Sequence, residues 1–271
     1  MIKKYETTPG TKLDFEAMAL DSFINVKKKL EYPPVAISIG AATLGQNTYA
    51  IPFGTFGNFS CIVGASKSKK TFFKSLIIAS FIGGSTTRNA PNIKGERDKD
   101  MFILDFDTEQ GQWHSQNVFQ RVGKLVGENY EYYKPFYLRK YDWKERLQFI
   151  EWCILDSDYR NNIGLISIDG FADLVKDVND LEAANNLTQK LMKWSEVSKA
   201  HLTGVLHSNF GTSKPTGHLG SAILKKAETV CMLERDEVNE KVVNVNFPFT
   251  RSFGIESFQF IIGNNGLPII L

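Results

Sequence analysis

The chain has 271 residues, of which 42% are hydrophobic and 23% are charged, so its composition is that of an ordinary folded protein and excludes a disordered or fibrous chain. The net charge is only +2, so a nucleic acid would have to be held by a local basic patch and not by the charge of the whole molecule. The three cysteines, Cys61, Cys153 and Cys231, form no CxxC pair or Cys/His cluster, so we expect a cytoplasmic protein without zinc or disulfides. No apolar stretch is long enough to cross a bilayer, and we expect no membrane partner.

Residues 1–34 predict an N-terminal arm or packing helix. Its apolar residues recur at roughly helical spacing and stop before Pro33-Pro34, which would end a helix. They are Leu13, Phe15, Met18, Leu20, Phe23, Ile24 and Leu30. We expect residues 35–271 to form one further domain.

The rest of the chain alternates short apolar runs with helical patterns. The expected strands are at residues 35–39, 48–52, 59–63, 101–104, 164–169 and 202–207, and the expected helices at about residues 71–81, 112–126, 143–155 and 181–199. This alternation predicts an α/β fold with a mostly parallel central sheet flanked by helices. Residues 241–247, 258–262 and 267–271 are expected to add antiparallel edge strands, the last two as a hairpin.

The expected strand at residues 59–63 runs into Gly64-Ala-Ser-Lys-Ser-Lys-Lys70-Thr71, which opens a helix. The string matches the P-loop pattern G-x-x-x-x-G-K-[ST] at its first Gly and at Lys-Thr; in that pattern, backbone N–H groups and a helix N-terminus wrap phosphates. Lys70 is then expected to reach the β/γ oxygens of ATP, and Thr71 to bind Mg²⁺. The expected nucleotide-binding residues are Gly64, Ala65, Ser66, Lys67, Ser68, Lys69, Lys70, Thr71 and Phe72.

Lys69 departs from the pattern, because it stands where the second glycine is expected. If the backbone is left-handed there, a residue other than glycine costs on the order of 1 kcal/mol, so altered nucleotide affinity is expected. Together, Lys67, Lys69 and Lys70 would add attraction for an anion. The alternative is a solvated basic turn without a ligand.

Two later strands end in carboxylates. The segment Met101-Phe-Ile-Leu-Asp-Phe-Asp-Thr-Glu109 resembles the strand end of RecA and its relatives, which implies that Glu109 is the general base that polarises the attacking water. The segment Ile163-Gly-Leu-Ile-Ser-Ile-Asp169 looks like a Walker B strand, which implies that Asp169 orients the Mg²⁺ water shell, with Asp173 in a supporting role. The alternative for both segments is a polar strand end without a catalytic role.

Two further segments resemble the RepA-type and DnaB-type hexameric helicases. Leu202-Thr-Gly-Val-Leu-His207 resembles the strand whose terminal His or Gln senses the γ-phosphate, which implies that His207 is the sensor. Pro215-Thr-Gly-His-Leu-Gly-Ser221 resembles the glycine-rich segment that faces DNA or a neighbouring subunit, where Lys214 and His218 would touch phosphate. A solvated loop is the alternative for this second segment.

Arg251 falls where those helicases place a finger that reaches into the nucleotide of the adjacent subunit. A guanidinium suits this role because it binds two phosphate oxygens at once. The lysine that precedes the finger in that family is absent, and Phe249 stands in its place. Arg235, Lys225 and Lys226 are alternatives for the finger.

Together the motifs span about residues 57–251, and their order resembles the RecA-like P-loop ATPases of the RepA/DnaB hexameric helicase type, including those of phages and mobile elements. The resemblance implies ATP and Mg²⁺ as ligands, single-stranded or duplex DNA as a partner, and a homo-oligomeric ring or filament. We therefore predict an oligomeric ATPase that acts on DNA, as a helicase or loader in replication or mobilisation of an element. Two alternatives stay open: a non-hydrolysing nucleotide-binding interaction module, and a small-molecule kinase whose lid would need Arg88 and Arg97.

Overall fold

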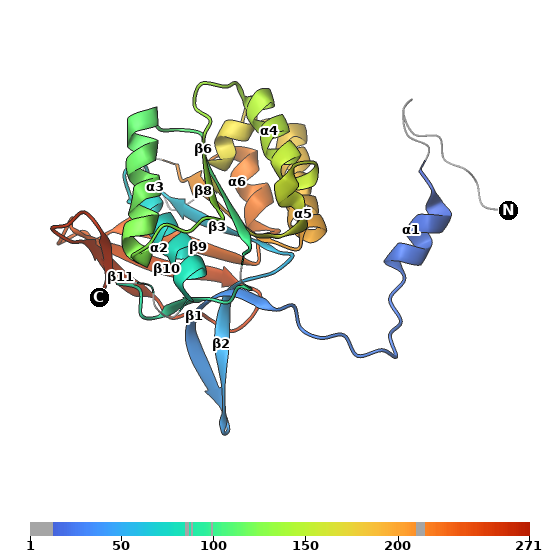
Figure 1. Ribbon diagram of the computed structural model, residues 1–271, viewed down its shortest axis with the longest axis horizontal. Coiled ribbons are helices and arrows are strands. Elements are labelled where there is room, and N and C mark those ends of the chain that lie inside the picture. Colours follow the sequence, from blue (N-terminus) through green and yellow to red (C-terminus); the bar gives the residue numbers. More distant parts are fainter. Residues whose placement is uncertain (1–12, 85–86, 88, 99, 210–214) are drawn as a thin grey trace. The chain divides into compact units, whose positions relative to one another are not determined.

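The computed structural model describes residues 13–84, 87, 89–98, 100–209 and 215–271 (Figure 1). The chain divides into two compact units, Met1–Tyr32 and Pro33–Leu271. The division falls just before the Pro33-Pro34 pair that marks the expected end of the N-terminal arm.

The first unit contains the helix α1 (Phe15–Ser22), which is capped at its start by the side chain of Asp14. The helix is shorter than the spacing of the apolar residues suggests, because the backbone becomes extended at Phe23. The side chain of Asn25 then accepts a hydrogen bond from Lys27 N and favours a turn over a further helical turn. No residue of α1 is buried.

Among the described residues, the central sheet of the second unit has nine strands in the order β12-β11-β10-β9-β3-β8-β7-β5-β6. They are β3 (Phe59–Gly64), β5 (Phe102–Asp107), β6 (Tyr133–Tyr137), β7 (Ile163–Asp169), β8 (His201–His207), β9 (Thr229–Arg235), β10 (Val242–Thr250), β11 (Phe258–Ile262) and β12 (Pro268–Ile270). The strands from β9 to β6 run parallel, and β10, β11 and β12 join antiparallel at one edge. The predicted α/β class, with a mostly parallel sheet and antiparallel C-terminal strands, is confirmed.

Helices cover both faces of this sheet (Figure 1). On one face lie α2 (Lys70–Gly83) and α3 (Gln112–Val126); on the other lie α4 (Trp143–Leu155), α5 (Leu181–Ser198) and α6 (Gly217–Leu224), with 3₁₀ turns at Asp158–Asn161 and Phe171–Leu174. Successive residues of one strand point to opposite faces of the sheet and pack against different helices. On β5, Ile103 packs in the core under α2 and α3, and Leu104 packs in the core under the other three helices. The inner strands are apolar on both faces because both faces are buried.

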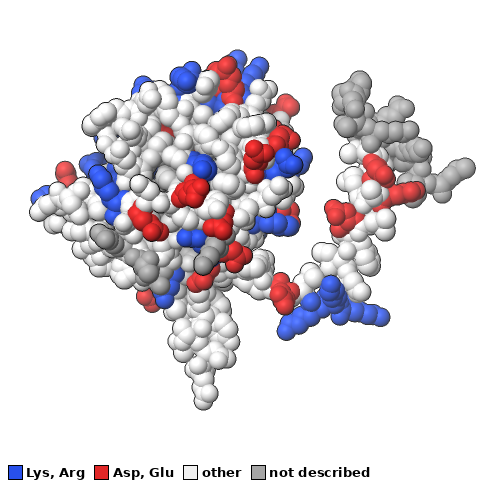
Figure 2. Space-filling model, viewed as in Figure 1, with Lys and Arg blue, Asp and Glu red and all other residues white. Residues whose placement is uncertain are grey.

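A smaller antiparallel sheet, in the order β2-β1-β4, lies against the α2 side. Its strands are β1 (Val35–Leu44), β2 (Asn47–Thr55) and β4 (Ile93–Gly95). The first two form a hairpin longer than predicted, with a turn at Gly45, where φ is +64°. The far end of this hairpin projects from the body and carries no charged residue (Figures 1 and 2).

Three strands were not predicted from the sequence. β4 has only three residues, which is too short to show a period. β6 contains Pro135 and alternates poorly, and it is an edge strand, a place where proline is tolerated. β9 begins with the mostly buried run Thr-Val-Cys-Met-Leu, and the apolar character of this run would have been enough to predict a strand.

A buried polar network joins the two sheets near the start of β3. His201 Nδ1 donates to Thr55 O at 3.1 Å, and His201 Nε2 lies 2.9 Å from Ser60 Oγ. Glu228 accepts hydrogen bonds from Thr55 N and Thr55 Oγ1, both at 2.8 Å. Burial lowers the pKa of His201 to about 4 from its ordinary 6.5, so the imidazole is neutral in the folded chain.

We expect His201 to make the protein less stable in acid. Its pKa is lower in the folded chain than in the unfolded chain, so stability is lost as the pH falls from about 6.5 toward 4. For this one group the free energy of unfolding should fall by roughly 2 to 3 kcal/mol between about pH 7 and pH 4.5. Denaturant unfolding of His201→Gln should lack this part of the acid dependence. His114→Gln, at an exposed histidine, should keep it, and an equal dependence in all three proteins would contradict the assignment.

Candidate functional site

Four parallel strands bring their carboxyl ends together at one edge of the central sheet. β3 ends at Gly64, β8 at His207, β7 at Asp169 and β5 at Asp107. Gly64 lies opposite His207 in the ladder, and Asp107 lies opposite Asp169. Residues predicted from four separate segments therefore meet at the edge where open α/β sheets bind ligands.

The loop from Gly64 to Thr71 has two positions that favour glycine, one because of space and one because of backbone conformation. A Cβ at Gly64 would lie 2.5 Å from Ser68 Oγ and 2.7 Å from Leu233 O, so only glycine fits there. Lys69, at the second glycine position, adopts the left-handed conformation with φ of 67°. Its ammonium lies 5.6 Å from the centre of the Phe72 ring, a cation–π distance. The lysine is thus accommodated, but in a conformation that favours glycine.

Lys69→Gly is expected to be more stable than Lys69→Ala by about 1 kcal/mol, because only glycine relieves the left-handed backbone. Both variants lose the same ammonium and the same contact with Phe72, so comparing them isolates the backbone effect. Denaturant unfolding of the two variants side by side measures the difference. Equal stabilities would show that this residue stores no strain.

Lys70 begins α2, and its ammonium contacts three groups of the site. Nζ donates to Gly64 O at 2.8 Å and to Ala65 O at 2.7 Å, and lies 3.2 Å from His207 Nδ1. Burial lowers the pKa of Lys70 to about 8, although Asp169 and Glu109 act in the opposite direction. Lys70 is held by the loop's own carbonyl oxygens, which a phosphate oxygen could replace.

His207 connects Lys70 to Glu109. An ammonium has no acceptor, so His207 Nδ1 accepts from Lys70 and the ring proton lies on Nε2. Nε2 in turn donates to Glu109 Oε2 at 3.3 Å. This hydrogen bond lowers the pKa of Glu109, and the charges of Lys70 and Arg139 act in the same direction against partial burial. Glu109 is therefore ionised at neutral pH, as a general base must be.

Thr108 forms hydrogen bonds between the strand end that carries Glu109 and the strand end that carries Asp169. Its N and its Oγ1 each lie 2.8 Å from Asp169 O, and Gly170 N donates to its Oγ1 at 3.0 Å. Asp173 Oδ2 lies 2.7 Å from the same hydroxyl. Asp173 therefore contacts Thr108, and its supporting role at the metal stays a prediction.

One buried lysine beneath the loop faces three carboxylates. Lys74 Nζ lies 3.0 Å from Asp105 Oδ1 and 3.3 Å from Asp169 Oδ2, and the Lys74 and Asp105 side chains are fully buried. Tyr133 donates to the other oxygen of Asp105 at 2.7 Å. Burial alone would lower the pKa of Lys74, but Asp105, Asp169 and Asp107 together raise it above its ordinary value. Lys74 is therefore a charged ammonium inside the protein.

The oxygens near the loop fit a hard divalent cation. Mg²⁺ is usually held by one or two carboxylates together with substrate phosphates and water. Asp107 Oδ2 is buried and makes no hydrogen bond with any described residue; Asp169 Oδ2 makes none either, although it lies 3.3 Å from Lys74 Nζ. Thr71, at the start of α2, adds a hydroxyl about one helical turn before Lys74. Thr71, Asp107 and Asp169 therefore carry oxygens that could hold Mg²⁺, and the assignment of Thr71 and Asp169 to that role stays a prediction.

Arg121 of α3 supports the start of α2. Its guanidinium lies 3.7 Å from the centre of the Phe72 ring, and its Nη1 lies 3.2 Å from Ser75 Oγ and 3.4 Å from Thr71 O. Burial lowers the pKa of Arg121 to about 10, with Asp169 opposing. The Phe72 ring is thus engaged by Arg121 and Lys69, and its contact with a nucleotide stays a prediction.

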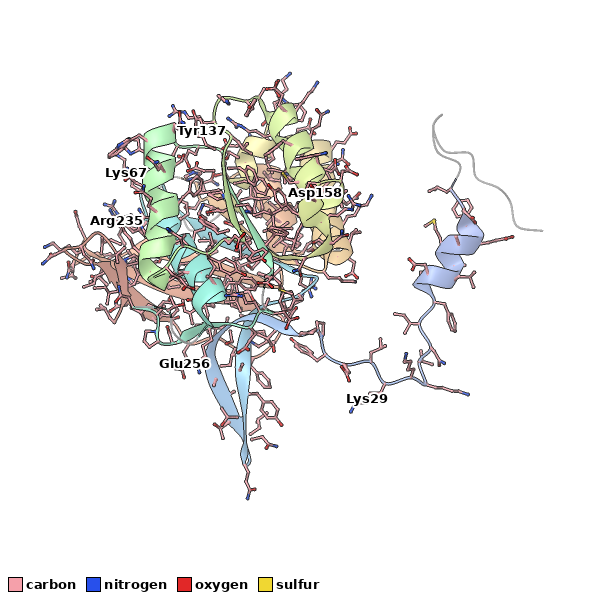
Figure 3. The ribbon with its side chains drawn as sticks, viewed as in Figure 1. Lys29, Lys67, Tyr137, Asp158, Arg235 and Glu256 are labelled. Carbon is pink, nitrogen blue, oxygen red and sulfur yellow. The ribbon has the colours of Figure 1, made fainter. Side chains whose placement is uncertain are left out.

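A pocket of about 400 Å³ opens beside the loop, within the range of roughly 300 to 1,000 Å³ that is typical of small-molecule sites. The loop residues Gly64, Ala65, Ser66 and Ser68 line it together with residues at the end of β9. Ser68 Oγ is buried there and makes no hydrogen bond with any described residue. Arg235 donates from Nε and Nη2 to Lys67 O, at 3.1 and 2.7 Å. Figure 3 shows the two residues near each other beside the pocket.

Arg251 lies at the opposite end of the sheet from the loop. Its N donates to Glu228 O, its Nη2 donates to Lys226 O at 2.7 Å, and Glu228 N donates to Phe59 O at the start of β3. Phe59 and Gly64 are the two ends of one strand, about 16 Å apart, so Arg251 does not reach the loop of its own chain. Lys225 and Lys226 lie at the same end as Arg251, whereas Arg235 contacts its own loop. A role for Arg251 at a neighbouring nucleotide stays a prediction.

Two of the other named residues, Lys214 and Arg88, lie outside the described part of the chain. His218 is exposed in the first turn of α6. Arg97 Nε donates to Ile82 O at 2.9 Å, near the end of α2 and about 18 Å along that helix from Lys70. Arg97 is therefore anchored far from the loop, which does not favour the small-molecule kinase.

Sequence reasoning missed Lys74 and Arg121. Lys74 could have been found from the sequence. It is the one charged residue after Lys70 in the mostly apolar segment of α2, and its spacing of four residues places it on the same helix face as Lys70. The role of Arg121 could not have been found from the sequence, because α3 is amphipathic and an arginine on such a helix is normally exposed to solvent.

The strand order, the loop after β3 and the neighbouring antiparallel strands define a RecA-like P-loop fold. A solved structure of a KaiC-like protein from the hyperthermophilic archaeon Pyrococcus horikoshii is similar, with a TM-score of 0.55 and 14% sequence identity over 80% of this chain and 90% of that chain. At this identity the likeness shows the fold alone. No protein-family model and no curated protein matches the sequence. Within the described residues, no helix is both long enough and apolar enough to span a membrane.

Proposed function

We propose that this chain is an Mg²⁺-dependent ATPase that works as a homo-oligomer on DNA, as a helicase or loader in the replication or mobilisation of a mobile element. The observation that carries the ATPase is the chain of contacts from Lys70 through His207 to Glu109. A lysine suited to phosphate and an ionised carboxylate suited to water activation contact the same imidazole.

ATP would bind with its phosphates over the loop that ends at Thr71. The N-terminus of α2 attracts an anion, and Lys70 would exchange loop carbonyls for phosphate oxygens. The buried Ser68 hydroxyl, which has no partner among the described residues, would donate to a phosphate. The pocket beside the loop has the size for the nucleoside.

Glu109 would orient and partly deprotonate the attacking water. Bound Mg²⁺ would neutralise charge that develops on the phosphates, held by Thr71 and Asp169. When Lys70 turns to a phosphate, His207 Nδ1 loses its hydrogen-bond donor. His207 therefore links the state of the phosphate site to Glu109, which suits the sensor role.

Assembly and DNA binding rest on the helicase resemblance and on two exposed residues. Arg251 is exposed and beyond reach of its own loop, so it is available to the nucleotide of a neighbouring subunit. His218 is exposed at the start of α6, in the segment that resembles the DNA-facing loop.

A second candidate is an interaction module that binds ATP without hydrolysing it. Lys69 favours it, because a left-handed lysine stands where the P-loop pattern has glycine. The test is ATP turnover with Mg²⁺, with and without single-stranded DNA, together with the mass of the protein in the presence of ATP. Our proposal expects turnover that DNA stimulates and a larger mass with ATP. Tight binding without turnover would support the second candidate, and absence of ATP binding would overturn both.

A further inference from the structure

Lys74 has a set of buried contacts that the proposed mechanism does not use. It lies one turn after Lys70 on α2, so the two side chains leave the same face of the helix. Lys70 contacts the loop, whereas Lys74 contacts the strand ends beneath it. The site therefore has a second ammonium on the inner side of Asp169.

Fixed partners hold Lys74 in place. Both oxygens of Asp105 are engaged, Oδ2 by Tyr133 at 2.7 Å and Oδ1 by Lys74 at 3.0 Å. The same ammonium lies 3.3 Å from Asp169 Oδ2, in a geometry that is an ion pair but not a hydrogen bond. The exposed fractions of the Lys74, Asp105 and Asp169 side chains are 0%, 0% and 3%, so water does not screen these contacts.

Three carboxylates gather beneath the loop, and Lys74 is the cation that forms ion pairs within this group. Asp105, Asp107 and Asp169 lie on the same face of β5 and β7, because the first two alternate along one strand and the last two are opposite in the ladder. Lys74 forms ion pairs with Asp105 and Asp169, and the charges of Lys70 and Arg121 also act on Asp169 from farther away. A triphosphate bound over the loop would lie near this carboxylate group, and its repulsion would be greatest without a divalent cation.

We infer that Lys74 is a positioning residue of the nucleotide site: a built-in cation that holds Asp169 in place and offsets the carboxylate charge beneath the phosphates when Mg²⁺ is absent. The inference rests on the proposed function. Its consequence is that ATP binding depends less on Mg²⁺ than it would without Lys74. Lys74 contacts neither phosphate nor metal, and acts through Asp169.

The test compares the Kd of ATP with Mg²⁺ and with EDTA, by calorimetry. In Lys74→Met the ratio of Kd in EDTA to Kd in Mg²⁺ should exceed the wild-type ratio by at least about tenfold, because the uncompensated carboxylates repel metal-free ATP and attract Mg²⁺. An unchanged ratio would overturn the inference while leaving the ATPase proposal intact. If the wild-type protein binds ATP in neither buffer, the proposed function itself fails.

Tyr133→Phe is the matched control, because it removes a buried hydrogen bond of Asp105 but keeps the ammonium. Its ratio should equal that of the wild type, and a rise as large as that of Lys74→Met would show that packing, not charge, sets the ratio. Thermal unfolding establishes that each variant is folded. If Lys74→Met does not fold, Asp105→Asn is the second variant, because it keeps the ammonium and removes one of the three carboxylates. Its ratio of Kd in EDTA to Kd in Mg²⁺ should fall below that of the wild type, and an unchanged or higher ratio would overturn the inference.

Discussion

Lys70→Met is expected to weaken ATP binding by at least about 100-fold. The variant keeps an unbranched side chain but loses the ammonium that now contacts Gly64 O, Ala65 O and His207 Nδ1. Hydrogen bonds to charged groups contribute about 1.5 to 3 kcal/mol each, so losing two phosphate contacts accounts for this factor. Calorimetric titration with ATP and Mg²⁺ measures it.

Lys69→Met is the matched control, because it removes the same charge one residue earlier. The Lys69 ammonium lies over the Phe72 ring and makes no contact with Gly64 or Ala65, so we expect its loss to weaken binding by less than about tenfold. Equal losses in the two variants would mean that the loop attracts anions only through its total charge. That outcome would favour the solvated basic turn.

Glu109→Gln is expected to lower kcat by about 100-fold or more while changing the affinity for ATP only slightly. The amide keeps the size of the carboxylate and can still accept the hydrogen bond from His207 Nε2, but it cannot take a proton from water. General-base catalysis contributes typically about 10² to 10⁴ in rate. Steady-state turnover and equilibrium binding, measured on the same preparation, separate the two effects.

Glu182→Gln provides the comparison, because this glutamate is exposed in the first turn of α5, on the face of the sheet opposite α2. Its turnover should match that of the wild type. If Glu109→Gln retains full turnover as well, the general base lies elsewhere. If it loses binding as much as turnover, Glu109 has a structural role and the proposed mechanism is wrong.

The sequence was sufficient for the fold class because the inner strands are buried on both faces. Runs such as Ile163–Asp169 are mostly apolar and are buried throughout, and the amphipathic helices between them have clear periods. Edge elements carry weaker signals. β6 is half-exposed and contains proline, and the far half of the β1–β2 hairpin is uncharged without a regular alternation. Tertiary pairing, and not local preference, makes these segments strands.

The order of the motifs also indicated where the site lies, because parallel strands end at the same edge of a sheet. Gly64, Asp107, Asp169 and His207 meet there as a consequence. The pairing of particular side chains did not follow from the motifs. The hydrogen bond between His207 and Glu109 crosses from one strand end to another, and its existence depends on side-chain directions that spacing does not specify.

The contacts of Lys74 likewise could not be predicted from the spacing of the motifs. A lysine in an apolar helix reads from sequence as an exposed charge or as an anomaly, since lysine is rarely buried without a partner. Its partners, Asp105 and Asp169, come from segments 31 and 95 residues away, so only the folded sheet brings them within 3.3 Å.

Titration of the purified wild-type chain with ATP and Mg²⁺ tests the central claim most directly. The arrangement of Lys70, Ser68 and Thr71 predicts saturable binding, complete below about 1 mM and lost in Lys70→Met. No binding at that concentration, or binding that Lys70→Met leaves unchanged, would contradict the assignment of this loop as a nucleotide site.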